Sequence, residues 1–489
     1  MLKLFRNIAV AFYAFISLLV IFAAPAFTYA CKSSVFSYYP VVIALSILFV
    51  VFFACFLGRK TFSLSDSRFN MVLNIAAVAL FAFQLVFIYL AWFRTGWDVW
   101  WLTSGTFESG LSEYLSRCPN QIVLFCFIKA LRDVCGHCGI DAYLVLVLIS
   151  CICCNLSLQL ITRVARLLFD DCVALVTLVF GFLFIGLSPW ALVPYSDTFS
   201  MPFTVGILYC AVCRQGSKYN LPVMLFLAGI GYLIKPTVIF IALSLLLAML
   251  SSAKSIDSLK QRFRRLIPDL RVAACTVLVL VAVVVVKGSC AHSVPNLDDA
   301  AAQGMTHFLY MGANDDAGGV YNVDDIEFSS RFTDSKERSA AEIAGWKERI
   351  SSMGPLGTVA LVGKKTLTNF ADGMFGWTFE GNFFFQFEGH SSLGASLIGA
   401  HGNTKLYRMF QIVSQSIWFF ILIGVSLGFL RGNVSVGEGA VYFSICMLAV
   451  FLMVFEARGR YLVLYLPYFV MLGVAGVIAL GRRIRSLRG

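Results

Sequence analysis

Charged residues are scarce in this sequence: Asp, Glu, Lys and Arg make up only 13% of its 489 positions. Water-soluble domains carry about 25% charged residues, so this chain cannot cover an ordinary water-facing surface. Hydrophobic residues instead make up 59% of it. A helix that crosses the hydrocarbon core needs roughly 20 apolar residues and satisfies its own backbone there. The sequence therefore predicts an all-α polytopic membrane protein, with its long apolar runs at residues 7–30, 39–57, 71–93, 141–162, 171–194, 271–287, 407–430, 438–455 and 461–480.

Acidic residues are outnumbered by basic ones, 27 against 38, which gives a net charge of +11. Such an excess in a soluble protein would suggest nucleic acid, but here the basic residues lie between apolar runs and indicate topology. We therefore expect a lipid bilayer around the chain and no nucleic acid partner. If the basic connections face the cytoplasm, both termini are cytoplasmic. About twelve spans then fit, with shorter or broken ones at residues 197–213, 220–234 and 236–252.

This topology places two long connections outside the cytoplasm, residues 94–140 and 288–405. Within the first, residues 119–134 are too short and too charged to span, and they predict an amphipathic helix in the membrane interface. The second predicts a mixed extracytoplasmic loop region, with a helix over residues 334–370. The predicted parts of the chain are N-terminal transmembrane helices (1–70), a transmembrane core (71–290), the extracytoplasmic loop region (291–405) and C-terminal transmembrane helices (406–489).

The sequence lacks the patterns that would indicate a thiol–disulfide exchange site, a calcium-binding loop or a transporter built from repeats. Cys135-Gly-His-Cys138 has the spacing of a thiol–disulfide exchange motif, but no βαβ pattern surrounds it, which leaves a local disulfide or two free thiols. The acidic stretch 304–327 lacks the ligand spacing and terminal Glu of an EF-hand, so we expect no metal. The sequence also has no internal repeat, which argues against a transporter.

Polar residues at membrane depth are costly and are therefore candidates for a functional site. Several are predicted to meet at the outer face, although they are distant in sequence. Each also has a structural interpretation: Asp98 could cap a helix or pair with Arg94, Lys235 could extend to the interface, and Glu456 could pair with Arg458 or Arg460. The candidates are Asp98, Glu108 and Glu113 in the first outer loop, Tyr195 and Asp197 at the end of a span, Lys235 beside a break before Pro236, and Glu456, Arg458 and Arg460 between the last two spans.

These residue types suit group transfer from a lipid-linked donor. A polyprenyl phosphate leaving group needs cations at headgroup level, and Lys and Arg bind phosphate oxygens. A carboxylate is needed to accept the proton of an acceptor hydroxyl. Asp98 is the expected base. Arg458, Arg460 and Lys235 are the expected phosphate ligands.

The order of these parts resembles the GT-C glycosyltransferase superfamily, such as protein O-mannosyltransferases and lipid A aminoarabinose transferases. The resemblance covers about residues 70–480. It is carried by Asp98 in the first outer loop, the proline-containing motif 114–121, the basic-aliphatic turn 162–169, the outer Asp197, and the motifs 231–237, 311–314 and 456–461.

The resemblance implies juxtamembrane helices and inverting transfer of a sugar from a polyprenyl-phosphate donor to an extracytoplasmic acceptor, without a cofactor, in a bacterial plasma membrane. It implies supporting roles for Tyr195, Asp197, Asn120 and Glu456. The sequence departs from the family in having two additional spans before the loop that holds Asp98, and a single aspartate near the span instead of an acidic pair. Glu108 or Glu113 could therefore serve as base instead.

Two other functions remain open. A transporter or flippase of lipid-linked glycans would place charges near the bilayer midplane, whereas the candidate charges lie at one surface. A polymerase or ligase that uses a lipid-diphosphate donor has the same needs as a transferase. The sequence does not identify the sugar or the acceptor.

Overall fold

The computed structural model describes residues 1–27, 34–57, 63–214, 216–253, 269–400 and 402–487, and isolated positions between 255 and 267. Within these residues, eight helices are long and apolar enough to cross a membrane by length and composition. They are α1 (Leu2–Ala23), α2 (Tyr39–Phe52), α3 (Asp66–Ala91), α7 (Ala142–Leu168), α13 (Leu270–His292), α18 (Lys405–Ser426), α19 (Val436–Val454) and α20 (Leu466–Ser486).

Short turns extend some of these helices, and four shorter helices complete the bundle. The extensions are η1 (Ala24–Ala26) after α1, η3 (Ser34–Tyr38) and η4 (Phe53–Leu57) around α2, η11 (Gly428–Leu430) after α18, and η12 (Gly459–Tyr465) before α20. The shorter helices are α8 (Asp171–Gly181) with η7 (Phe182–Gly186), α9 (Ser196–Cys213), α10 (Asn220–Ile234), and α11 (Ile239–Ser252) after η9 (Pro236–Val238).

Side-chain caps determine where many of these helices begin. A Ser, Thr or Asp oxygen at the N-cap accepts a hydrogen bond from a backbone N–H of the first turn, which would otherwise lack a partner. The break between α10 and α11 falls at Lys235, because Pro236 cannot continue the helix before it. The capping residues are Ser65 for α3, Asp141 for α7, Asp170 for α8, Asp269 for α13, Thr404 for α18 and Ser435 for α19.

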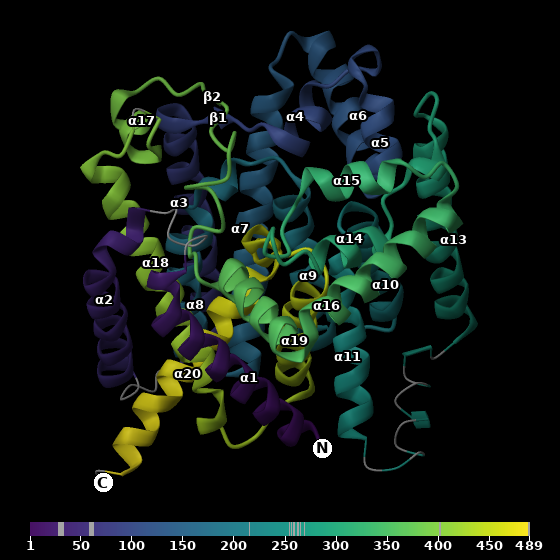
Figure 1. Cartoon of the computed structure of the whole chain (residues 1–489). Coiled ribbons are helices and arrows are strands. Elements are labelled where there is room, and N and C mark those ends of the chain that lie inside the picture. Colours follow the sequence, from purple (N-terminus) through teal and green to yellow (C-terminus); the bar gives the residue numbers. More distant parts are fainter. Residues whose placement is uncertain are drawn as a thin grey trace.

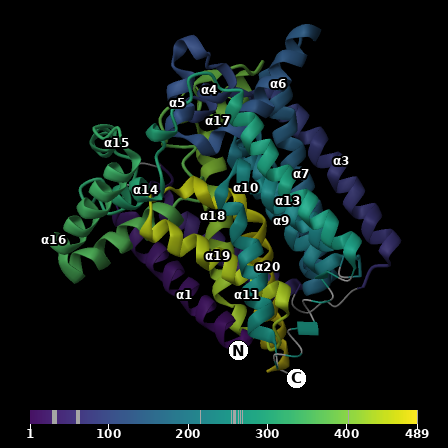
Figure 2. The same cartoon turned by 90° about the vertical axis from the view of Figure 1, so that its right-hand side faces the viewer.

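Helix α20 lies at the centre of the bundle. Its most apolar stretch is 94% buried, whereas that of α13 is only 6% buried and faces outward. From the C-terminus, α20 runs into the middle of the molecule (Figure 1). Both termini lie at the same end of the bundle (Figures 1 and 2).

Glycines let α20 approach α18 at van der Waals distance. A Cβ atom at Gly424 of α18 would lie 2.0 Å from the carbonyl oxygen of Gly473, and one at Gly476 would lie 1.9 Å from the carbonyl oxygen of Gly424. No other residue fits at such distances, and small residues at a helix interface are a common way for membrane helices to pack.

Two groups of shorter elements lie outside the bundle. The first, at the end opposite the termini, is α4 (Trp97–Ser104), η5 (Phe107–Ser109), α5 (Leu111–Arg117), η6 (Pro119–Gln121) and α6 (Ile122–Cys138). The second is α14 (Met305–Gly312), α15 (Val323–Ser330) and α16 (Ser335–Phe370), which stand out from one side of the bundle in Figure 2. Nearer the first group, η10 (Asp299–Ala301) packs on α5, and α17 (Ser392–Ile398) packs on α3.

One short antiparallel ladder joins the two groups. Strand β1 (Phe93–Arg94) follows α3 directly and pairs with β2 (Gln386–Phe387), with Phe93 opposite Phe387 and Arg94 opposite Gln386. The long loop after α16 is therefore fixed next to the segment that leads into α4.

The structure confirms an all-helical membrane protein, and it changes some details. The apolar run 171–194 is shorter as a helix than predicted, because α8 and the π-helical η7 end at Gly186 and the run continues as the turn η8 (Pro189–Leu192). The predicted helix over 119–134 is present as η6 and α6, and Cys135 and Cys138 at its C-terminal end are free thiols.

Candidate functional site

Asp98 lies in the first turn of α4, directly after the β1–β2 ladder. The backbone there has an unusual conformation: Trp97 has φ +43°, and Asn382, which accepts a hydrogen bond from the N–H of Gly96 at 2.8 Å, has φ +63°. A Cβ atom at Gly96 would lie only 2.7 Å from that of Asn382. Strained positions of this kind occur mostly where surrounding structure enforces them, often at functional sites.

The carboxylate of Asp98 is held by two distant segments. The Tyr195 hydroxyl, at the start of α9, donates a hydrogen bond to Asp98 Oδ2 at 2.7 Å, and Arg460 Nη2 lies 3.3 Å from the same oxygen. Burial by itself would raise the pKa of Asp98, but the charge of Arg460 and the hydrogen bond from Tyr195 together hold it below its ordinary value. Asp98 is therefore ionised, with 29% of its side chain exposed.

Arg460 is a buried guanidinium with unused hydrogen-bond donors. Its Nε and Nη1 atoms have no hydrogen-bond partner among the described residues, although only 5% of the residue is exposed. Three aromatic rings surround it, those of Trp97, Tyr195 and Tyr461, at 5.3, 5.4 and 5.5 Å from its central carbon. Leaving a buried charged donor unsatisfied costs about 1–3 kcal/mol or more, so this position favours an anion that can accept from it.

Lys235, at the break between α10 and η9, is already neutralised. Its Nζ lies 2.5 Å from Oδ1 of Asp197, and both residues are buried. The same Nζ lies 4.8 Å from the centre of the Tyr461 ring. This pair therefore supports the wall of the site next to Arg460, and Lys235 is less available for an incoming anion than Arg460 is.

Arg458 and Glu456 lie next to Arg460 in the same connection. Arg458 Nε is 3.7 Å from Oε1 of Glu380 and 3.8 Å from Oε1 of Glu456, too far for a hydrogen bond to either. The Tyr461 hydroxyl donates to Oε2 of Glu456 at 2.8 Å. Arg458 thus has loose ion pairs that a better acceptor could replace.

Some predicted residues lie apart from this cluster. Glu108 on η5 and Glu113 on α5 are exposed and make no hydrogen bond or ion pair within the described part of the chain. Asn120 is exposed as well. Arg94 pairs with Asp141 at 2.6 Å and Glu388 at 2.9 Å, so the suggested Asp98–Arg94 pair is wrong.

Sequence reasoning missed two contributors. Gln121 is buried and its side-chain amide donates to the Tyr195 hydroxyl at 2.9 Å, which orients that hydroxyl toward Asp98. The sequence did point to this region, because Gln121 belongs to the motif 114–121, but the supporting role was predicted for Asn120 instead. Glu380, beside Arg458, had no sequence signal, since it lies in a long loop of aromatic and small residues.

The site lies at the end of the bundle away from the termini. Arg482 of α20 pairs with Asp170 at 2.6 Å, and Arg166 of α7 pairs with Asp66 at 2.8 Å, so the start of α3 and the end of α20 share one end. Asp98 follows the other end of α3, and Arg460 precedes α20. Among the described residues, no group of three or more His, Cys, Asp or Glu side chains could hold a metal ion.

Comparison with known proteins gives a family. A search of curated proteins and a search of solved structures each found no similar chain. One family model matches residues 3–478, almost the whole length, and its description agrees with the bundle of apolar helices seen here. The chain belongs to the family of conserved hypothetical integral membrane proteins.

Proposed function

We propose that this protein is a membrane glycosyltransferase that moves a sugar from a polyprenyl-phosphate donor to an acceptor hydroxyl outside the cytoplasm. The observation that carries the proposal is the buried guanidinium of Arg460. Two of its nitrogens have no hydrogen-bond partner among the described residues, and the third lies 3.3 Å from the ionised Asp98. A cation with free donors and a carboxylate base are the two groups that such a transfer needs side by side.

Arg460 can serve both groups at once. Its Nη2 lies 3.3 Å from Asp98, while Nε and Nη1 are buried and have no partner among the described residues, so they would donate to phosphate oxygens that reach them. Arg458 would add a second contact by leaving its long ion pairs. The phosphate leaves with the electron pair of the anomeric C–O bond, and these positive charges stabilise it. Asp98 accepts the proton of the acceptor hydroxyl as that oxygen attacks the anomeric carbon.

The surrounding aromatic side chains suit a sugar and a lipid. Trp97 is fixed by a hydrogen bond from its Nε1 to the carbonyl oxygen of Gly381 at 2.8 Å, and it packs on Trp190 and Phe383 at 6.2 and 5.7 Å. A fixed indole next to Asp98 offers an apolar face for a sugar ring. No metal is needed in this scheme, because arginines supply the positive charge.

Membrane topology is part of the proposal. We place both termini in the cytoplasm of a bacterial cell and the Asp98 cluster at the outer face, with about twelve spans. Four helices would join the eight long ones: α8, α9, α10 and α11. The common end of the two termini and the basic Arg166 and Arg482 there support this orientation.

Lipid binding to the purified protein tests the proposal. Native mass spectrometry in detergent would compare a polyprenyl phosphate, the uncharged polyprenol and a polyprenyl diphosphate of equal chain length. We expect the monophosphate to bind in preference to the alcohol, and we expect Arg460→Ala to remove that preference. Arg117→Ala, at an exposed position on α5, is the matched control. Equal binding of phosphate and alcohol would contradict the proposal, and preference for the diphosphate would favour a diphosphate-dependent ligase.

A further inference from the structure

Lys365 is a buried lysine without an acidic partner. It lies near the end of α16 with 0% of the residue exposed, and no ion pair reaches it within the described part of the chain. Its neighbour Lys364 is 42% exposed and pairs with Asp315 at 2.7 Å. Burial lowers the pKa of Lys365 to about 7. A buried amine is costly, so its contacts call for an explanation.

Those contacts are two backbone carbonyls from different parts of the molecule. Lys365 Nζ donates to the carbonyl oxygen of Gly312, at the end of α14, at 2.7 Å. It also donates to the carbonyl oxygen of Phe455, directly after α19, at 2.6 Å. The side chain therefore joins α14 and α16 to the connection that holds Glu456, Arg458 and Arg460.

Close backbone packing strengthens this junction. A Cβ atom at Gly312 would lie 2.6 Å from the carbonyl carbon of Phe455, so only glycine fits there. The N–H of Ala457 donates to the carbonyl oxygen of Gly319 at 2.8 Å, and Gly319 has φ +72°, which favours glycine. The turn 312–319 thus lies directly on residues 455–457.

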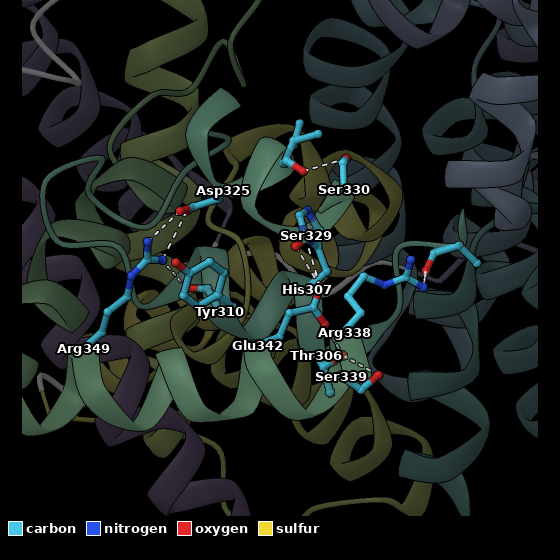
Figure 3. Close-up of polar contacts among 12 residues, drawn as sticks. Thr306, His307, Tyr310, Asp325, Ser329, Ser330, Arg338, Ser339, Glu342 and Arg349 are labelled. Atoms are coloured by element: carbon cyan, nitrogen blue, oxygen red, sulfur yellow. Dashed lines mark hydrogen bonds and ion pairs between the residues drawn. The ribbon is translucent and has the colours of Figure 1, made fainter. Parts of the chain in front are cut away.

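The elements behind this junction are themselves firmly connected (Figure 3). Ser329 of α15 lies 2.8 Å from His307 Nδ1 of α14 and donates to Glu342 of α16 at 2.8 Å. Arg349 of α16 pairs with Asp325 of α15 at 2.6 Å. Helices α14 and α15 and the part of α16 before its kink at Gly354 are therefore tied together. Lys365, on the part of α16 after the kink, joins this unit, residues 305–370, through its hydrogen bond to Gly312.

We propose that Lys365 is a positioning residue for the anion site: by holding Gly312 and Phe455 together, it fixes residues 455–461 and thereby the places of Arg458 and Arg460. The identity of the anion rests on the function proposed above, but the clamp itself does not. Its consequence is that the 305–370 unit and the anion site are mechanically coupled.

Two variants at Lys365 distinguish the effect of losing its hydrogen bonds from the effect of losing its amine charge. Lys365→Met keeps the apolar stem of the side chain as far as Cε and removes every donor. Lys365→Gln keeps an N–H donor group but is one bond shorter, so it cannot reach both carbonyls. Lys364→Met is the matched control, because it removes the neighbouring, half-exposed lysine.

Hydrogen–deuterium exchange of the full-length protein would follow the amides of residues 455–461, and polyprenyl-phosphate binding would be measured on the same samples. We expect Lys365→Met to speed exchange there at least tenfold and to weaken binding at least tenfold, with Lys365→Gln between it and the wild type and Lys364→Met unchanged. If Lys365→Met speeds exchange over residues 455–461 but the wild-type protein binds polyprenyl phosphate no better than polyprenol, the clamp is retained and the proposed function is rejected.

Unchanged exchange over residues 455–461 in Lys365→Met would overturn the clamp. If that variant does not fold, Lys365→Gln decides in the same way: wild-type exchange overturns the clamp, and faster exchange supports it. Faster exchange throughout the chain, rather than in this segment and the turn 312–319, would also overturn it, because it would reveal a general loss of stability.

Discussion

Replacing Asp98 by Asn should separate catalysis from stability. Asn has nearly the same shape but no charge and no basic oxygen. General-base catalysis is typically worth about 10²–10⁴-fold in rate, which corresponds to about 3–5 kcal/mol of activation free energy. The ion pair with Arg460 is partly solvated, since 29% of the Asp98 side chain is exposed. Arg460, however, is buried, and the amide oxygen of asparagine replaces only part of its interaction with the carboxylate. We therefore expect a stability cost of about 1–3 kcal/mol.

The assay would measure both quantities on one preparation. Transfer of a radiolabelled sugar from its polyprenyl-phosphate carrier gives kcat/KM, and thermal unfolding followed by tryptophan fluorescence gives stability. We expect transfer to fall by about 10²–10⁴-fold, with a small change in melting temperature. Asp133→Asn is the control, because Asp133 is an exposed carboxylate on α6 that pairs only with Lys129 within the described part of the chain.

The pH profile provides an independent check. The pKa of Asp98 is lowered, so the carboxylate stays ionised and able to accept a proton at every pH above its ordinary value of about 4. Wild-type kcat/KM should therefore show no loss on the acid side until the pH falls below about 4. A stable Asp98→Asn protein with near-normal transfer would refute the assignment. The base would then have to be Asp197, which is committed to Lys235, or one of the exposed Glu108 and Glu113.

Four further outcomes are expected. Arg460→Ala should weaken binding of the polyprenyl-phosphate donor by at least tenfold in equilibrium titration, because it removes a charge-assisted contact; unchanged affinity would rule out Arg460 as a phosphate ligand. Transfer should persist in EDTA, and a loss that manganese or magnesium restores would contradict the metal-free scheme. A cysteine substituted for the exposed Glu337 should react with an impermeant maleimide added outside intact cells, more strongly than the parent chain does. Labelling only after permeabilisation would show that the topology is the opposite of the one proposed. Finally, the lowered pKa of Lys365 means that above pH 7 the unfolded chain binds more protons than the folded chain. The free energy of unfolding of the wild type, relative to that of Lys365→Met, should therefore rise by about 2 kcal/mol from pH 7 to pH 9. A flat or falling difference in chemical unfolding would show that the amine of Lys365 is not buried.

Much of the helical framework follows from the sequence, because long apolar runs have few alternatives in a membrane. The break before Pro236 and the helix near residues 119–134 could be placed for the same kind of local reason. The run 171–194 misled, since hydropathy continues unchanged through the π-helical turn at Phe182–Gly186 and the 3₁₀ turn after Ser188. Apolar composition indicates that a segment lies away from water, in the protein interior or in lipid, but it does not indicate where a helix ends.

The site was predictable only in part. Asp98, Tyr195 and Arg460 could be proposed together, because each follows or precedes a span at the same predicted face. Their pairing could not be, since Asp98 and Arg460 are 362 positions apart and the partner depends on how the helices pack. Glu380 had no signal, because a carboxylate in a loop is an ordinary surface feature in a sequence. The pair Lys364-Lys365 suggested a contact with lipid headgroups, and nothing in the sequence shows that Lys365 is buried.

The glycine contacts between α18 and α20 restrict how this protein can change shape. With backbone against backbone at Gly424, Gly473 and Gly476, neither helix can rotate or slide without a steric clash. We therefore expect the two helices to move as one body, with Arg460 in the turn η12 that leads into α20. On the function proposed above, the opening that admits a long lipid would come from the periphery, where the most apolar stretch of α13 is only 6% buried. Lipid entry and release would then move peripheral helices such as α13, while α18 and α20 keep their positions.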